Sequence, residues 1–165
     1  MQNFSVQAAK IVGTPSQKTW SQVHTFFPED SLKKEKRGIL LAVLSFAGIG
    51  EGIEALSVGR EILLRLHEEY YGQTEVPVLE QLRKAVGRVC QEFAQEEQKL
   101  EICAGVLLGD VLYLAISGGG QVWLKRQDAL GRVLEGNGEV VDGSGLLEEG
   151  DVLVLGTSSF FGALG

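Results

Sequence analysis

The spacing of the apolar residues changes twice along this sequence. Residues 38–46 form a nearly continuous apolar run, whereas between residues 53 and 99 the apolar side chains recur three, four or seven positions apart. From residue 101 onward the apolar residues return to short runs that are broken by glycine. Continuous short runs are typical of buried strands, and the wider spacing is typical of amphipathic helices. The chain must therefore place helices between two groups of strands, which predicts an α+β domain.

Two helices are predicted in the central segment. The first spans residues 53–71 and ends at Gly72, a residue type that commonly terminates helices. The second follows Thr74, which is suited to an N-cap, and runs to about Lys99. Because the link between them is short, the two helices are expected to form an antiparallel pair, whose apolar faces need a cover.

Strands are predicted on both sides of the helix pair. Before it, Phe4–Val12 and Ser21–Phe27 alternate as in a hairpin, and a charged segment, Lys33–Arg37, precedes the central apolar strand. After it, Gly109-Asp110 is a two-residue hairpin signal between the first two strands. The strands expected in this second half are residues 101–108, 111–117, 121–125, 132–134, 139–141 and 152–155. The sheets are therefore expected to be mostly antiparallel, without an internal repeat or a domain boundary.

Charge and hydropathy exclude several classes of partner. Lys and Arg number 15 against 22 Asp and Glu, a net charge of −7, which argues against binding to a nucleic-acid backbone. The longest apolar run is far shorter than the roughly 20 residues that a membrane span needs. The first residues also lack the basic and apolar regions of a signal peptide. We therefore expect no nucleic acid and no membrane as partners, and a cytoplasmic location.

Common catalytic and metal-binding patterns are not found. His24 and His67 stand apart from each other and from Cys90 and Cys103, so they form no zinc-type ligand spacing. Both cysteines lie among apolar residues and are expected to be reduced core residues. The glycines 118–120 precede a strand rather than a helix, which favours a tight strand connection over a phosphate-binding loop.

Three glycine-containing segments stand in a fixed order around the helix pair, at residues 41–50, 114–124 and 147–164. Their order and spacing resemble the metal-dependent serine/threonine protein phosphatases of type 2C. In that family the segments read as a strand ending in Asp-Gly-x-Gly-Gly, as Ala-x-x-Gly-Asp-Ser-Arg-x-Tyr, and as Gly-Asp-x-x-x-Leu-x-Ser/Thr-Asp-Gly-Leu. The resemblance covers about residues 10–164 and implies a four-layer architecture, with helices outside two antiparallel β-sheets.

The same resemblance implies that the catalytic metals are missing. The family's aspartates hold two divalent metals whose bridging water attacks the phosphate, and here Ser45, Gly119 and Ser158 stand at their positions. Residues 13–20 also lack the family's Arg-x-x-Asn-x-Asp pattern. Serine and glycine supply no anionic oxygen for Mg²⁺ or Mn²⁺. We therefore expect no cofactor, and a pseudophosphatase that acts as a binding or regulatory module.

Two other functions stay open at this point. A divergent phosphoserine or phosphothreonine phosphatase could bind Mn²⁺ or Mg²⁺ through substitute carboxylates, for which Glu51 and Glu54 are the first candidates. Both glutamates also suit a helix N-terminus, where negative charge is stabilising. Alternatively, the chain is an α+β interaction module unrelated to phosphatases, with a ligand near Ser117–Gln121.

The third segment of the family pattern is followed by further helices and a last strand, whereas this sequence stops at Gly165. We expect a single type 2C-like domain over residues 1–165 that lacks those C-terminal helices. A sheet face left without them favours self-association or a protein partner, unless the chain is the front part of a longer protein. Phe160 and Phe161 are the apolar candidates for that interaction surface.

Overall fold

The computed structural model describes residues 4–13, 19–47, 53–93 and 99–165. Within these residues the elements are, in chain order, β1 (Thr19–Phe26), α1 (Ser31–Lys36), β2 (Ile39–Ala47), α2 (Ile53–Tyr71), α3 (Val78–Phe93), β3 (Lys99–Leu108), β4 (Val111–Ser117), β5 (Gln121–Arg126), β6 (Ala129–Glu135), β7 (Val141–Leu146), β8 (Val152–Gly156) and α4 (Ser158–Ala163). None of the described helices is long and apolar enough to span a membrane.

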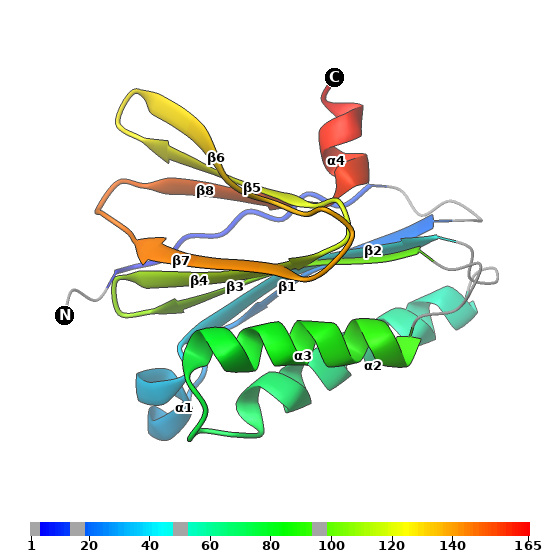
Figure 1. Cartoon of the computed structure of the whole chain (residues 1–165), viewed down its shortest axis with the longest axis horizontal. Coiled ribbons are helices and arrows are strands. Elements are labelled where there is room, and N and C mark those ends of the chain that lie inside the picture. The colour runs from blue at the N-terminus through cyan, green and yellow to red at the C-terminus, as the bar shows by residue number, and fades with distance from the viewer. Residues whose placement is uncertain (1–3, 14–18, 48–52, 94–98) are drawn as a thin grey trace.

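Two antiparallel sheets and a helix pair form the layers of the fold (Figure 1). The larger sheet has the strand order β1-β2-β3-β4-β7, and the smaller one has the order β6-β5-β8. Helices α2 and α3 cover one face of the larger sheet, and the smaller sheet packs against its other face. The predicted α+β class with two antiparallel sheets is therefore confirmed. In the described part of the chain, no helical layer covers the outer face of the smaller sheet.

Strand β2 shows how the larger sheet divides its two faces. Its residues alternate between buried and half-buried positions, as successive side chains of a strand point to opposite faces. Leu40, Leu44 and Phe46 face the helices and belong to the main apolar core. Ser45, between two of them, therefore points to the opposite face, toward the smaller sheet.

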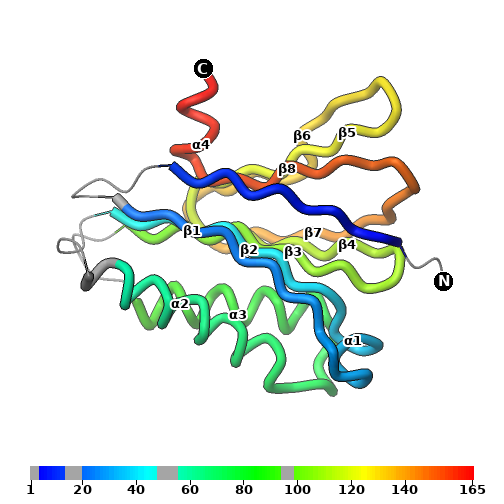
Figure 2. Tube along the Cα trace, turned by 180° about the vertical axis from the view of Figure 1, so that it is seen from behind, coloured from blue at the N-terminus to red at the C-terminus, as the bar shows by residue number. Residues whose placement is uncertain are grey.

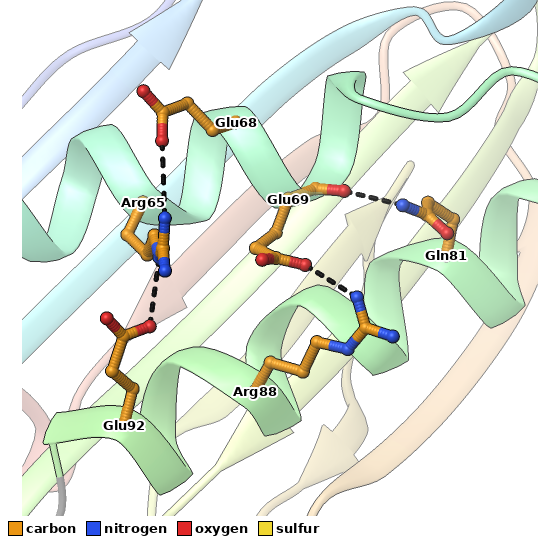
Figure 3. Close-up of polar contacts among 6 residues, drawn as sticks. All are labelled: Arg65, Glu68, Glu69, Gln81, Arg88 and Glu92. Carbon is orange, nitrogen blue, oxygen red and sulfur yellow. Dashed lines mark hydrogen bonds and ion pairs between the residues drawn. The ribbon is translucent and has the colours of Figure 1, made fainter.

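The helix pair is joined by polar contacts along its length (Figure 3). Arg65 of α2 lies 2.9 Å from a carboxylate oxygen of Glu92 in α3, and Arg88 of α3 lies 2.9 Å from Glu69 of α2. The buried side chain of Gln81 donates a hydrogen bond to the backbone carbonyl of Glu69, with an N–O distance of 2.5 Å. This last contact satisfies a carbonyl in the final turn of α2, where the helix itself offers no donor.

The predicted N-terminal hairpin is wrong. Residues 4–13 belong to no strand, and β1 pairs with β2 instead. The N-terminal segment runs between β1 and β8 in both views (Figures 1 and 2). Ile11 and Val12 are 73% and 49% exposed. The alternating apolar residues of the N-terminal segment therefore form no continuous buried face.

The helices differ from the prediction in four places. The charged segment before the central strand is helix α1, because the Asp30 carboxylate caps it by accepting hydrogen bonds from two backbone N–H groups. Helix α3 begins at Val78 rather than after Thr74, and Lys99 is the first residue of β3 rather than the end of a helix. Helix α4 was not expected at all.

The predicted glycine turns are confirmed. Gly109 has a φ of 64° in the tight turn between β3 and β4, and Gly118 has a φ of 98° in the connection from β4 to β5. Glycine adopts such positive φ values without the steric cost that other residues meet. The second of these turns carries the chain from the larger sheet to the smaller one.

Candidate functional site

The three positions predicted from the resemblance converge on one carboxylate, that of Glu101 in β3. Ser45 lies directly opposite Glu101 in the pairing of β2 with β3, so the two side chains project from the same face of the sheet. A Cβ added at Gly119 would lie 3.5 Å from Glu101 Oε1 and 3.3 Å from the Cβ of Ser158. We call Ser45, Glu101, Gly119 and Ser158 the Glu101 cluster.

Glu101 is held at the start of helix α4. The backbone N–H of Ser158 donates to Glu101 Oε2 at 2.9 Å, and the Ser158 hydroxyl donates to Oε1 at 2.5 Å. Thr157, which occupies the N-cap position, makes no capping bond with its own side chain. A carboxylate from a distant strand thus satisfies one of the free N–H groups at the helix start, where negative charge is also favoured.

Two glycines beside this carboxylate, Gly118 and Gly136, have no room for a side chain. A Cβ at Gly118 would lie 2.7 Å from Glu101 Cγ, and one at Gly136 would lie 2.1 Å from the Gly118 carbonyl oxygen. The N–H of Gly136 donates to the carbonyl of Gly120 at 2.8 Å, which ties the start of β5 to the end of β6. The predicted strand connection therefore also forms one wall of the Glu101 cluster.

Phe160 and Phe161 hold helix α4 against strand β8. A Cβ at Gly156, the last residue of β8, would lie 2.7 Å from each of the two rings. Both phenylalanines are half-buried, and their ring centroids are 5.2 Å apart. A large part of their apolar surface therefore packs within the chain.

The predicted substitute ligands are not placed by the structure. Glu51 lies outside the described residues, and Glu54 lies in the first turn of α2, where only the backbone is described. Among the described residues, no group of three or more His, Cys, Asp or Glu side chains is arranged to hold a metal ion.

The cysteines occupy the environments expected of core residues. Cys103 is buried and Cys90 is half-buried, and both are free thiols. Burial raises the pKa of Cys103 to about 12, and it also raises the pKa of Cys90. Both thiols therefore stay protonated near neutral pH and are poor nucleophiles.

The two histidines lie on the opposite face of the larger sheet from the Glu101 cluster. Their ring centroids are 6.4 Å apart, and the His67 ring packs edge-on against Phe26 at 4.3 Å. Desolvation lowers the pKa of both histidines. They are half-buried and form part of an aromatic contact between β1 and α2.

Glu101 is the site residue that sequence reasoning missed. It stands in a segment whose following residues, 102–108, carry no charge. In the strand it shares the face of Cys103 rather than that of the core residue Ile102. The signal that could have identified Glu101 is a single acidic residue next to an otherwise uncharged strand.

Solved structures share this arrangement of layers. The phosphatase domain of the cell fate determinant SpoIIE from Bacillus subtilis matches 90% of this chain with a TM-score of 0.56 at 16% identity. The Mycobacterium tuberculosis serine/threonine phosphatase PstP matches 84% of the chain with a TM-score of 0.53, also at 16% identity. This chain has the fold of type 2C phosphatase domains.

The likeness to these type 2C domains is one of fold. A Mycobacterium tuberculosis protein with RsbU and RsbW domains matches 85% of the chain at 19% identity with a TM-score of 0.53, and the match covers 39% of that protein. The chain spans 62% of the SpoIIE structure and 77% of the PstP structure. No protein-family model matches the sequence, and no curated protein matches it.

Proposed function

We propose that this type 2C phosphatase-like domain is catalytically inactive and acts as a binding or regulatory module. The observation that carries the proposal is the pair of hydrogen bonds between Glu101 and Ser158. A two-metal site needs several carboxylates with oxygens free to ligate. At the positions given by the resemblance, the chain offers serine, glycine and serine. The carboxylate that lies beside them, that of Glu101, is hydrogen-bonded at the start of a helix.

In this proposal the Glu101 carboxylate has a structural role in place of a catalytic one. In a phosphatase the acids near the metals hold cations that activate water, and removing them removes the nucleophile. In this chain both Glu101 oxygens accept hydrogen bonds from the residue that begins α4. The cluster therefore supports a fixed helix start, and hence a stable surface around α4 for a protein partner.

The second candidate function is a divergent metal-dependent phosphatase. This function is favoured by the Glu101 carboxylate, which lies within the Glu101 cluster close to Ser45 and Gly119. Glu101 would have to exchange its bonds to Ser158 for a cation, together with acids such as Glu51 or Glu54.

Hydrolysis of a phosphoserine peptide in the presence of Mn²⁺ separates the two functions. We expect no release of phosphate above that of a Glu101→Gln variant, with PstP as the active control. Release that is abolished both by a chelator and by Glu101→Gln would establish the divergent phosphatase instead. A Ser158→Ala variant serves as a matched control, because it frees Glu101 Oε1 while keeping the carboxylate.

A further inference from the structure

No described element covers the outer face of the smaller sheet (Figure 1), and several apolar side chains on that face are exposed. Val122 of β5 is buried between the sheets, so the next residue, Trp123, and then Lys125 point outward. Leu130, Val152 and Val154 flank them at 65%, 53% and 39% exposure. With Arg132 these residues form what we call the Trp123 face.

The six residues of the Trp123 face form two rows across the strands. In the pairing of β5 with β6 and β8, Trp123 lies between Arg132 and Val154. Lys125 lies between Leu130 and Val152 in the neighbouring row. Each row thus places one cationic side chain beside apolar ones. The Trp123 ring is at the centre of one row, and the Lys125 ammonium group is at the centre of the other.

The tryptophan ring is held in place. Its Nε1 donates to Gln121 Oε1 at 2.8 Å, and the Arg132 guanidinium carbon lies 5.9 Å from the ring centroid. Arg132 is itself paired with Glu135 at 3.1 Å, which offsets its charge. The ring is therefore a fixed apolar surface, and Lys125 is the exposed cation at the centre of the face.

We propose that the Trp123 face binds a second copy of the chain about a two-fold axis that runs across the strands between the two rows. Such an axis brings each row onto the other row of the second copy. Trp123 then faces the second copy's Lys125, and Lys125 faces the second copy's Trp123. A two-fold interface requires each contact to occur twice in this way. A cation over an aromatic ring is attractive, and more so once the pair is desolvated.

The remaining positions of the face match in the same arrangement. Val154 meets the second copy's Val152, and Leu130 meets the aliphatic part of the second copy's Arg132, so that apolar surface leaves water on both sides. A docking without the row exchange would place Lys125 against Lys125 and is opposed by like charge. The alternation of cationic and apolar side chains between the two rows thus favours a second copy of the chain as the partner that binds the Trp123 face. The inference gives the proposed binding role a partner, but it does not depend on the absence of catalysis.

Sedimentation equilibrium of the full chain from low micromolar to several hundred micromolar concentration tests this inference. We expect a reversible monomer–dimer equilibrium. Lys125→Glu and Val154→Lys should each weaken dimerisation about tenfold or more, since either change removes a contact that occurs twice. Lys125→Arg keeps the cation and should keep the dimer. Leu64→Lys, at a residue on α2 that is 59% exposed, is the matched control and should leave the dimer unchanged.

A monomer throughout this concentration range would overturn the inference. It would also be overturned if Leu64→Lys weakened dimerisation as much as Lys125→Glu, or if neither variant of the Trp123 face had an effect. Assembly beyond a dimer would contradict the two-fold axis. Because Lys125 and Val154 are exposed, the variants should melt as the parent chain does at concentrations at which the parent is monomeric, and thermal unfolding checks this independently. Since the assay measures mass and not catalysis, its failure is distinct from that of the proposed function.

Discussion

Glu101 at the start of β3 accepts hydrogen bonds from both the backbone N–H and the hydroxyl of Ser158 at the start of α4. These two residues are 57 positions apart, and their contact joins the larger sheet to the last helix. The position of Ser158 is one at which the resemblance to type 2C phosphatases places a metal-binding aspartate. At this position the chain forms hydrogen bonds between Ser158 and Glu101.

Removing the Glu101 carboxylate should weaken the attachment of α4. Glu101→Ala leaves the Ser158 N–H without its partner, and we expect a loss of about 1 kcal/mol in the free energy of unfolding, as for loss of a helix cap. Urea unfolding measures it. Glu149→Ala, at an exposed glutamate in the turn before β8, should change the free energy by less than about 0.5 kcal/mol. Equal stability of the two variants would contradict a capping role.

Gly59 in α2 should tolerate no side chain. A Cβ there would lie 2.1 Å from the Trp20 ring, which is buried and packs against Phe46 with ring centroids 4.9 Å apart. We expect Gly59→Ala to destabilise the chain by about 1–3 kcal/mol through overpacking, despite the higher helix propensity of alanine.

The matched control for this prediction is Gly87→Ala in α3. A Cβ at Gly87 meets its nearest atom, Val140 Cγ2, at 3.8 Å, which is ordinary van der Waals contact. Alanine should therefore stabilise α3 by about 0.5–1 kcal/mol relative to glycine. Thermal melting of both variants measures the difference, and effects of the same sign would refute the packing argument.

The histidine pair should make stability fall as the solution becomes mildly acidic. Burial lowers the pKa of His24 below 6.5, and the positive charge of Lys10 acts in the same direction. Burial also lowers the pKa of His67, aided by His24 and Lys33, whereas Glu68 acts against it. The neutral rings are therefore favoured in the folded chain.

The sign of the pH dependence follows from these lowered values. As pH falls through the ordinary histidine value of 6.5, the unfolded chain takes up protons before the folded chain does. The contribution of the pair is thus fully present above that value and is lost as pH falls through the folded pKa values. Urea unfolding between about pH 7.5 and pH 5 measures it. A double variant, His24→Gln with His67→Gln, should show a smaller loss over this range, and an equal loss would be inconsistent with the prediction.

The order of the central elements was predictable from the sequence because the apolar period differs between strands and helices. Residues 39–47 and 53–71 carry strong patterns, and both elements form as expected. The N-terminal hairpin failed because pattern alone does not choose a pairing partner, and β1 finds its partner in β2. Helix α1 was missed because its charged residues carry no apolar stripe, and the Asp30 cap was identified only in the structure.

The candidate site was only half predictable, for a similar reason. The glycine turn was predicted as a strand connection, and Gly119 and Ser158 were found by their places in the family segments. Glu101 was missed because its place opposite Ser45 depends on the register of β2 with β3, and a helix pair separates these strands in the sequence. Register is set by packing across the whole sheet, which local spacing does not encode.

Calorimetric titration of the full chain with Mn²⁺ tests the central claim most directly. The PstP catalytic domain, which has been solved in complex with two manganese ions, serves as the positive control. For this chain we predict no binding tighter than about 1 mM, equivalent to roughly −4 kcal/mol, and no difference between the parent chain and Glu101→Gln. Tighter binding that Glu101→Gln abolishes would show that the carboxylate leaves Ser158 to hold a metal, and would contradict the account.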